Sequence, residues 1–405
     1  MKALRFSRNI PRYAAARLAG SVVAGRGAGP GPLELVDIDV PDLPGPDWVR
    51  IRPRLAGICG SDLATVDGRS SRYFEPIVSF PFVPGHEVVA DLDDDSRVVL
   101  EPVLGCATRG IDPPCAACAR GDLGGCEAIT LGNIEPGLQS GFCCDTGGGW
   151  STQMVAHTSQ LHPVPDDMSD EAAVMVEPTA CAVHGAHRAA PEPGARIAVL
   201  GAGTLGLLTV AALRDRAPDA TILVAARYPE QKALAAALGA DIVVAPEEWR
   251  RGVRRMTGSL AVGDGHIDRL TGGADVVVDC VGSADSITES LAAVRPKGRV
   301  VMVGMPGSVQ VDLTGLWHRE IELVGAYAYG TETTPDGTGP TGDNRVRTFD
   351  LAFDLVRRAD LGRLVSATYP LSRYRDAIEH AAGAGARGAV KVAFDLRDEK
   401  ERTRL

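Results

Sequence analysis

The chain has 405 residues, of which 45% are hydrophobic, and a formal net charge of −10 at pH 7. That length exceeds one ordinary core, so two domains are expected. The acidic balance argues against nucleic acid or an anionic membrane as a partner, and no apolar run approaches the roughly 20 residues that cross a bilayer. The nine cysteines are spaced as metal ligands are. With no signal peptide visible, we expect a cytoplasmic protein rather than a disulfide-bonded one.

From the N-terminus to about residue 180 the pattern predicts an irregular, β-rich domain. Leu33 to Val40 and Trp48 to Ile58 alternate apolar and polar side chains, as expected of half-buried strands. Pro and Gly are frequent in this part, and long helical patterns are few. The segment Arg5 to Gly27 differs, since it is basic, Ala-rich and free of acidic residues. We expect it to be an insertion between the first two strands, surface-exposed or flexible.

From Ala195 the chain alternates strand-like and helix-like segments. In chain order, these are expected to be a strand over Arg196 to Leu200, a helix over Thr204 to Arg216, a strand over Thr221 to Ala225, a helix over Glu230 to Leu238, a strand over Asp275 to Asp279, a helix over Ser286 to Val294 and a strand over Arg299 to Val303. Strand–helix alternation of this kind builds a doubly wound parallel sheet, and this part of the chain is predicted to be a Rossmann domain.

The turn between the first of these strands and its helix matches a dinucleotide-binding fingerprint, Gly201-Ala202-Gly203-Thr204-Leu205-Gly206. Gly201 permits a tight turn, Gly203 lets the backbone approach a pyrophosphate, and Gly206 allows close packing of helix on strand. The free N–H groups of the helix that begins at Thr204 and Leu205 are available to phosphates. The pattern therefore predicts a nicotinamide dinucleotide site.

After the predicted Rossmann domain the chain changes character again. Thr331 to Asp343 is rich in Gly, Thr and Pro and predicts a loop. Two helices, near Phe349 to Arg358 and Tyr374 to Ala381, and a last strand over Ala389 to Phe394 are expected beyond it. No internal repeat is visible.

Candidate metal ligands lie beside turn-forming residues in the first domain. They are Cys59 in Gly57-Ile58-Cys59-Gly60-Ser61-Asp62, His86 and Glu87 after Gly85, and Glu177 before Pro178. A thiolate, an imidazole and carboxylates suit a zinc ion that keeps one coordination position open. The alternative is that Cys59 and His86 are buried structural residues. Zinc beside a nicotinamide cofactor indicates hydride transfer at an alcohol or carbonyl carbon.

These motifs resemble the zinc-dependent medium-chain dehydrogenases that act on alcohols and polyols. The matches occur in the family's order over residues 30 to 395, and they are Gly57 to Asp62, Gly85-His86-Glu87, Cys106 to Cys126, Glu177-Pro178 and Gly201 to Gly206. The resemblance implies a discontinuous GroES-like catalytic domain over residues 1–180 and 326–405, and a Rossmann domain over residues 181–325. Met1 to Leu4 resembles the family's first strand.

The resemblance also implies roles at the catalytic metal. In the polyol branch, Glu87 and Glu177 are the carboxylates near zinc: one ligates it while the other holds or exchanges with the metal-bound water. The metal lowers the pKa of a bound alcohol. Ser61 matches the hydroxyl that passes the alcohol proton outward, and its alternative is a turn-capping role. The usual relay histidine is replaced by Ala64, so water, Asp62 or the cofactor ribose would have to complete the proton route.

A second zinc, structural in role, is implied by a cysteine cluster. Cys115, Cys118 and Cys126 have the family's spacing, and Cys106 matches the first ligand. Eight residues separate Cys106 from Cys115, where the family usually has two, but a longer loop can still close at small entropic cost. Cys143 and Cys144 are rival ligands or surface thiols. A closed four-thiolate site stabilises a lobe and performs no chemistry.

The second Rossmann strand favours NADP over NAD. It ends Val224-Ala225-Ala226-Arg227-Tyr228, without the carboxylate that holds a ribose 2′-OH and with a guanidinium suited to a 2′-phosphate. The alternative is a solvent-facing Arg227 in a permissive site. In the family, the ends of later strands, here with Val281 and Gly304, line the nicotinamide.

The expected activity is that of a zinc-dependent oxidoreductase acting on a secondary alcohol, polyol or cyclitol-like substrate or its carbonyl counterpart. The alternatives are a family member with a primary alcohol or aldehyde substrate, one whose redox step is transient, or a non-catalytic cofactor-binding protein of the same fold. The expected partner is a small-molecule substrate. Relatives commonly form dimers or tetramers through their cofactor domains, so a homodimer or homotetramer is expected here.

Overall fold

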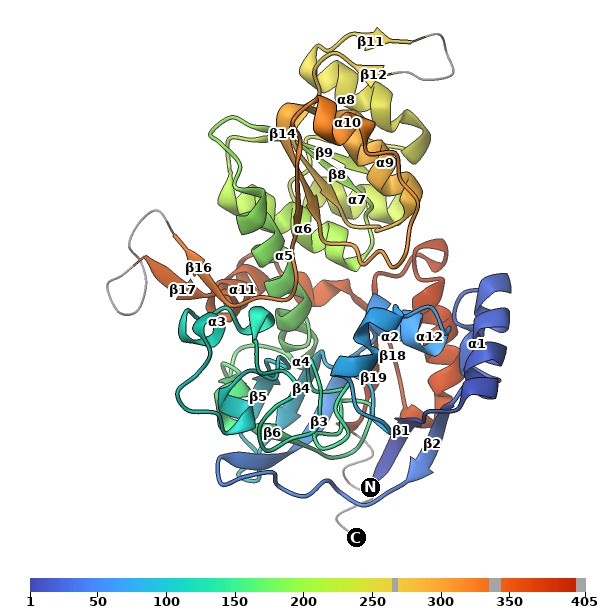
Figure 1. Cartoon of the computed structure of the whole chain (residues 1–405), viewed down its shortest axis with the longest axis vertical. Coiled ribbons are helices and arrows are strands. Elements are labelled where there is room, and N and C mark those ends of the chain that lie inside the picture. The colour runs from blue at the N-terminus through green and yellow to red at the C-terminus, as the bar shows by residue number, and fades with distance from the viewer. Residues whose placement is uncertain (264–268, 335–343, 398–405) are drawn as a thin grey trace. The chain divides into compact units, whose positions relative to one another are not determined.

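The computed structural model describes residues 1–263, 269–334 and 344–397 (Figure 1). Within it the chain forms two compact units. The first combines Met1–Glu177 with Tyr329–Leu405, so that the C-terminal part returns to the N-terminal part, and the second is the continuous segment Pro178–Ala328. This gives the expected fold class, a discontinuous β-rich unit with an inserted α/β unit.

The first unit is built on a seven-stranded sheet in the order β18-β19-β3-β4-β5-β7, with β6 also paired to β3. Its strands are β3 (Trp48–Gly57), β4 (Val88–Asp91), β5 (Arg97–Leu100), β6 (Met154–His157), β7 (Leu161–Pro163), β18 (Val365–Tyr369) and β19 (Lys391–Asp395). β19 pairs antiparallel with β3, where Ala393 faces Gly57. The last strand of the chain therefore lies beside the strand that leads to Cys59.

The inserted segment near the N-terminus is a folded helix. It lies between the paired strands β1 (Lys2–Phe6) and β2 (Leu33–Asp37) and comprises α1 (Ile10–Val22) and the short turn η1 (Arg26–Ala28). The buried carboxylate of Asp67 anchors it, because the backbone N–H groups of Gly25 and Gly27 donate to its two oxygens at 2.9 and 3.0 Å. Several side chains of α1 are exposed, which agrees with the first of the two expected alternatives, and the segment forms a helix that the sequence did not indicate.

The remaining elements of the first unit surround its sheet. They are α2 (Gly60–Val66), η2 (Arg72–Ile77), η3 (Ala107–Arg109), α3 (Ala116–Ala119), η4 (Leu123–Gly125), η5 (Thr158–Gln160), α4 (Asp170–Ala173), the start of α5 (Val176–Ala189), β16 (Thr331–Thr333), β17 (Arg345–Arg347), α11 (Thr348–Arg358), η7 (Leu361–Leu364), η8 (Leu371–Arg373), α12 (Tyr374–Ala382) and η9 (Gly385–Arg387). β16 and β17 pair antiparallel, so the loop predicted to begin at Thr331 begins after a strand. Residues 335–343 of that prediction lie outside the described residues.

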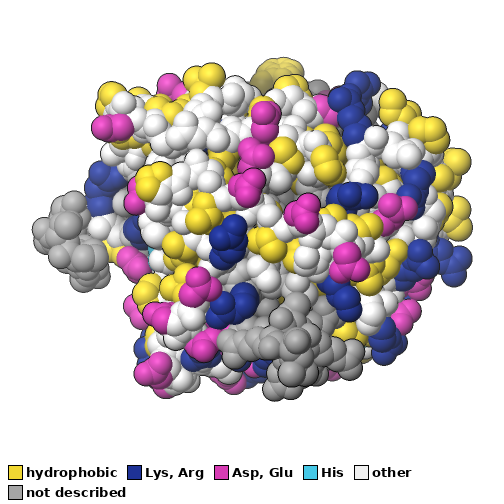
Figure 2. All heavy atoms as spheres, turned by 90° about the horizontal axis from the view of Figure 1, so that it is seen from below, with side chains coloured by type: hydrophobic (Ala, Val, Ile, Leu, Met, Phe, Trp, Pro, Cys, Tyr) yellow, Lys and Arg dark blue, Asp and Glu magenta, His cyan; other side chains and the backbone are white. Residues whose placement is uncertain are grey.

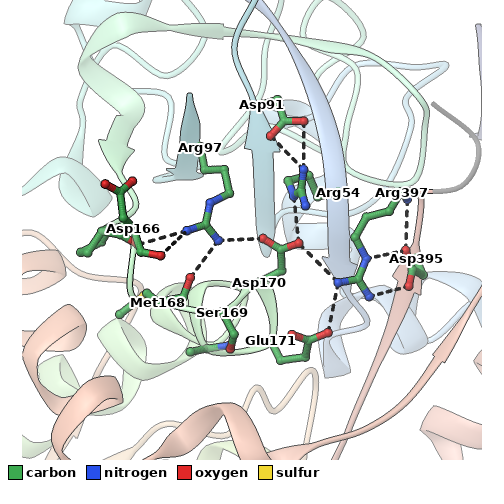
Figure 3. Close-up of polar contacts among 12 residues, drawn as sticks. Arg54, Asp91, Arg97, Asp166, Met168, Ser169, Asp170, Glu171, Asp395 and Arg397 are labelled. Carbon is green, nitrogen blue, oxygen red and sulfur yellow. Dashed lines mark hydrogen bonds and ion pairs between the residues drawn. The ribbon is translucent and has the colours of Figure 1, made fainter. Parts of the chain in front are cut away.

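Within the first unit, an ion-pair network connects the residues after β19 to the N-terminal part of the chain (Figure 3). The buried carboxylate of Asp170 accepts hydrogen bonds from Arg54 at 2.8 Å, Arg97 at 3.1 Å and Arg397 at 3.4 Å. The guanidinium of Arg397 also donates twice to Asp395, and its backbone N–H donates once. One carboxylate at the start of α4 therefore joins β3, β5 and the residues that follow β19.

The second unit is a doubly wound sheet. Six parallel strands run in the order β10-β9-β8-β13-β14-β15. They are β8 (Arg196–Leu200), β9 (Thr221–Ala225), β10 (Ile242–Val244), β13 (Ala274–Asp279), β14 (Val294–Met302) and β15 (Glu322–Gly325). Counted along the chain this is the order 3-2-1-4-5-6 of dinucleotide-binding sheets, and the predicted alternation of strands and helices is confirmed.

Helices cover both faces of this sheet. They are α6 (Thr204–Arg216), α7 (Pro229–Ala237), η6 (Pro246–Glu248), α8 (Trp249–Thr257), α9 (Ala284–Ala293) and α10 (Thr314–His318), with a small ribbon of β11 (Ala261–Val262) and β12 (Arg269–Leu270). Ala198 of β8 packs in one core cluster with Trp249 and Ile287 from α8 and α9. Its neighbours Ile197 and Val199 point to the other face and are also fully buried.

No helix in the described part of the chain is long and apolar enough to cross a membrane. The face shown in Figure 2 carries acidic and basic side chains interspersed with small apolar groups.

Candidate metal and cofactor sites

Three of the predicted ligands meet at the end of β3. Cys59 caps the N-terminus of α2, directly after that strand, while His86 and Glu87 immediately precede β4. β3 and β4 pair antiparallel, and the Gly57 N–H donates to the Glu87 carbonyl at 2.8 Å. As a result the ligand atoms of Cys59, His86 and Glu87 all lie within 4.8 Å of one another. His86 and Glu87 are buried and Cys59 is partly exposed.

Asp62 organises two of these ligands. Its Oδ2 accepts a hydrogen bond from the Cys59 backbone N–H at 3.0 Å, and its Oδ1 lies 3.6 Å from His86 Nδ1. Burial alone would lower the pKa of His86, but the carboxylate of Asp62 and the thiol of Cys59 together hold that pKa well above its usual value. A carboxylate behind a ligating imidazole fixes the orientation of the ring.

A buried lysine that sequence reasoning missed is paired with Glu87. Lys391 Nζ forms an ion pair with Glu87 Oε2 and donates to the Ile58 carbonyl at 3.4 Å. Both side chains are almost fully buried. Burial lowers the pKa of Lys391, but the charges of Glu87, Cys59 and Glu177 together raise it above its usual value. Lys391 begins β19, and only the antiparallel return of that strand onto β3 brings it to the site.

Glu177 lies beside this group of ligand atoms and outside it. The carboxylate is buried in the first turn of α5 and accepts a hydrogen bond from the Tyr329 hydroxyl at 3.0 Å. Burial raises the pKa of Glu177 to about 7, and the charge of Glu87 adds to the rise while that of His86 opposes it. Direct ligation by Glu177 stays a prediction. Tyr329 is a further candidate site residue, and no motif in the sequence around it indicates such a role.

The residues present fit a zinc ion with an open position. One thiol, one imidazole and one carboxylate converge, which is a suitable donor set for catalytic zinc. Ser61 follows Cys59 by two residues in the sequence. Its Oγ is buried and has no hydrogen-bond partner among the described residues. An unpaired buried hydroxyl is costly unless a bound group satisfies it. This is the hydroxyl expected to take the substrate proton.

The cysteine cluster is assembled as predicted. The sulfurs of Cys106, Cys115, Cys118 and Cys126 all lie within 4.8 Å of one another, and none forms a disulfide. Backbone N–H groups point at three of these sulfurs, at 3.3 to 3.5 Å. Such donors lower the pKa of Cys115 to about 6. Four free thiols in this arrangement fit a closed tetrahedral zinc site. The rival ligands Cys143 and Cys144 are not members of the cluster.

The glycine-rich turn has the geometry that its spacing predicts. Gly201 has φ of +101°, and a Cβ at Gly206 would lie 2.0 Å from the Gly201 carbonyl oxygen. Gly203 caps the N-terminus of α6, whose first residues are Thr204 and Leu205. A Cβ at Gly203 would meet nothing within 4 Å, so packing within the protein does not require glycine there. Close approach of a dinucleotide pyrophosphate to the backbone would require glycine at this position.

The other predicted cofactor residues follow the carboxyl ends of neighbouring strands. Val281 follows β13 and is half exposed, and Gly304 follows β14. A Cβ at Gly304 would lie 2.4 Å from the Gly282 nitrogen, so the two turns touch. Arg227 follows β9, is exposed, and its side chain makes no hydrogen bond or ion pair within the part of the chain described. Dinucleotides bind at this edge of such sheets.

Two family models match the chain, one for each unit. The Alcohol dehydrogenase GroES-like domain matches residues 45–166, and the Zinc-binding dehydrogenase domain matches residues 204–338. Together they cover more than half of the sequence. The chain belongs to the zinc-dependent medium-chain alcohol and polyol dehydrogenase family and is an oxidoreductase.

Among curated proteins, the chain is similar to the L-idonate 5-dehydrogenase of Vitis vinifera, with 28% identity over 90% of this chain and 92% of that protein. It is also 28% identical to the sorbitol dehydrogenase of Bacillus subtilis, over 86% and 90% of the two chains.

Two solved structures show the same fold. A putative zinc-binding dehydrogenase from Sinorhizobium meliloti bound to NADP has a TM-score of 0.67 and 22% identity, over 97% of this chain and 98% of that one. An Escherichia coli alcohol dehydrogenase in complex with NADH has a TM-score of 0.66 and 20% identity, over 90% and 96%.

Proposed function

We propose that this protein is a zinc-dependent oxidoreductase that transfers a hydride between NADP and a secondary alcohol, polyol or cyclitol-like substrate, or its carbonyl counterpart. The convergence of Cys59, His86 and Glu87, with their ligand atoms within 4.8 Å, carries this proposal. Family membership and similarity to the idonate and sorbitol dehydrogenases support a polyol-like substrate.

The residues of the chain have separate tasks in this reaction. Cys59, His86 and Glu87 would hold the zinc, which when bound polarises the substrate oxygen, and the nicotinamide supplies or accepts the hydride. Asp62 keeps the His86 imidazole oriented, and Lys391 fixes the Glu87 carboxylate.

Proton movement is assigned to Ser61. During oxidation Ser61 Oγ would accept the proton of the substrate hydroxyl while it passes its own hydroxyl proton on, and the carbinol carbon would give up a hydride to the bound nicotinamide to become a ketone. Ala64 stands where relatives carry the next relay group, so the proton passes from Ser61 to a group other than a histidine at that position.

The preference for NADP is assigned to the end of β9. The strand is followed by Ala226 and Arg227 with no carboxylate, so a ribose 2′-OH finds no acceptor there, whereas a 2′-phosphate finds a free guanidinium. Proteins of this fold are known with either NADP or NADH bound. The residues after β9, rather than the fold, therefore support NADP as the preferred cofactor.

The test is a spectrophotometric screen at 340 nm of secondary alcohols, polyols, cyclitols and primary alcohols, each with NAD and with NADP. Zinc-loaded wild-type protein, chelator-treated protein and Cys59→Ala protein would be compared. We expect turnover with secondary alcohols and NADP, loss on chelation, and recovery on adding zinc to wild type alone. Unchanged turnover in metal-free Cys59→Ala protein would exclude the zinc mechanism. Consistent failure with every substrate would favour a non-catalytic protein.

A further inference from the structure

The loop between the first two cysteines of the cluster contains an unusual buried arginine. Arg109 lies in the eight-residue spacer Ala107 to Pro114, at the end of η3, and its relative exposure is 0%. Charged side chains are almost never buried this completely unless a partner compensates them. Arg109 forms no ion pair with a carboxylate in residues 1–263, 269–334 or 344–397.

Backbone carbonyls surround the guanidinium instead. All three of its nitrogens donate, to five carbonyl oxygens at 2.6 to 3.5 Å, those of Leu104, Leu131, Ile134, Glu135 and Gly137. Four of these five belong to the segment that follows Cys126, and Leu104 precedes Cys106. One side chain thereby joins both flanks of the cysteine cluster.

The backbone of Arg109 reinforces the same connection. Its N–H donates to the Cys106 carbonyl at 3.1 Å, and its own carbonyl accepts from the Asn133 N–H at 3.0 Å. A Cβ at Gly132 would lie 2.3 Å from the Arg109 carbonyl oxygen, so the two segments are in direct contact. The long spacer, which at first sight weakens the cluster, supplies the residue that closes the lobe around it.

The charges that act on Arg109 come chiefly from sulfurs. Burial lowers the pKa of Arg109, whereas the thiols of Cys143, Cys126 and Cys106 when ionised, and less strongly the carboxylate of Asp145, act in the opposite direction. A zinc ion with four thiolates carries a net charge of −2, which is itself costly to bury. A buried guanidinium that forms no ion pair among the described residues and a zinc–thiolate cluster with excess negative charge therefore compensate each other.

We propose that Arg109 is the positioning residue and counter-charge that retains zinc in the site formed by Cys106, Cys115, Cys118 and Cys126. The proposal rests on the structural zinc that family membership and the cluster support. It is independent of the catalytic metal at Cys59, because none of the contacts of Arg109 reaches that site.

The test compares metal retention in wild type, Arg109→Met and Arg109→Lys. Arg319 provides a matched control: it is likewise buried and donates to the carbonyls of Leu291, Leu270 and Gly272, but lies in the second unit. Each protein would be loaded with Co²⁺ and challenged with a chelator while the sulfur-to-cobalt charge-transfer band is followed. The four-thiolate site dominates that band, because the Cys59 site offers one thiolate.

Partners of this kind typically alter metal affinity by roughly 10- to 100-fold. We therefore expect the band of Arg109→Met to decay at least tenfold faster than that of wild type. Arg109→Lys, which keeps the charge and loses the planar fork, should be intermediate. Arg319→Met should match wild type. If Arg109→Met does not fold, the comparison of Arg109→Lys with wild type decides the matter.

Two results would overturn the proposal in distinguishable ways. Equal decay rates in wild type and the Arg109 variants, or equally fast decay in Arg319→Met, would remove the specific role of Arg109 while leaving the metal site intact. A wild-type protein that shows no four-thiolate band would remove the structural metal itself. Neither result bears on turnover at the Cys59 site, which is measured separately.

Discussion

At the scale of single residues, the ion pair of Lys391 with Glu87 is a buried charge pair within the candidate active site. Both side chains are almost entirely buried, and removal of one partner from such a pair leaves an uncompensated charge, at a cost of about 3–5 kcal/mol. We expect Lys391→Met to lower the free energy of unfolding by that amount in urea titrations of metal-free protein.

The matched control for Lys391→Met is the double variant with Glu87→Gln, which removes both charges. Replacing a whole buried pair is often nearly neutral, so the double variant should recover most of the lost stability. A double variant as unstable as the single one would show that packing, rather than the charge pair, accounts for the loss.

The choice of cofactor depends on Arg227. A hydrogen bond to a charged group contributes about 1.5–3 kcal/mol, which corresponds to a factor of roughly ten to more than one hundred in affinity. Arg227→Ala should therefore weaken NADP binding by that factor and leave NAD binding nearly unchanged, as measured by fluorescence titration. Wild-type protein that binds both cofactors equally, or a variant that loses both, would contradict the assignment.

The sequence predicted those site residues whose role is indicated by their immediate neighbours in the chain. Cys59 and His86 stand next to turns that place them at strand ends, and the four cysteines all lie in one segment, residues 106–126. Lys391 and Tyr329 could not be predicted in the same way, because each meets its partner only when the C-terminal part folds back. Arg109 was hidden for another reason, since its surroundings in the sequence signal an exposed loop.

At the scale of elements, the network around Asp170 fixes the start of α4, which precedes the helix that carries Glu177 (Figure 3). Asp170→Asn removes the charge shared by Arg54, Arg97 and Arg397. The side chains of these arginines are about a quarter to a third exposed, which limits the loss of stability. We expect Asp170→Asn to lower the free energy of unfolding by about 1.5–3 kcal/mol, as measured by chemical denaturation.

The matched control for Asp170→Asn is Asp167→Asn, which breaks a well-exposed pair with Arg357 only three residues earlier. Exposed pairs of this kind contribute at most about 1 kcal/mol. Similar losses in the two variants would mean that Asp170 contributes no more than an ordinary surface pair.

Elements with one strong periodic signal were predicted with their bounds, and those that depend on tertiary anchoring were not. Strand β8 and helix α6 match the predicted ranges residue for residue. Helix α1 was missed, and the residues that follow it are held by Asp67, which lies beyond β3 in the sequence. Strand β16 was missed because its partner β17 lies across a Gly- and Pro-rich segment.

At the scale of the whole molecule, the second unit presents an edge suited to self-association. Among residues 1–263, 269–334 and 344–397, β15 is the last strand of its sheet and pairs on one side only, with β14. Its Leu323 is partly exposed, and Trp317 in the preceding α10 is 71% exposed. An exposed strand edge with apolar side chains beside it is a common site of pairing between chains. We therefore predict a homodimer or homotetramer joined along this edge.

Size-exclusion chromatography with light scattering tests this prediction. Wild type should have two or four times the chain mass, and Trp317→Glu combined with Leu323→Glu should shift it toward the monomer, because the two charges would be buried unpaired. Leu18→Glu on α1 is the control, since Leu18 is equally exposed at 72% and lies in the other unit. A monomeric wild type, or a mass that responds equally to Leu18→Glu, would exclude association through β15.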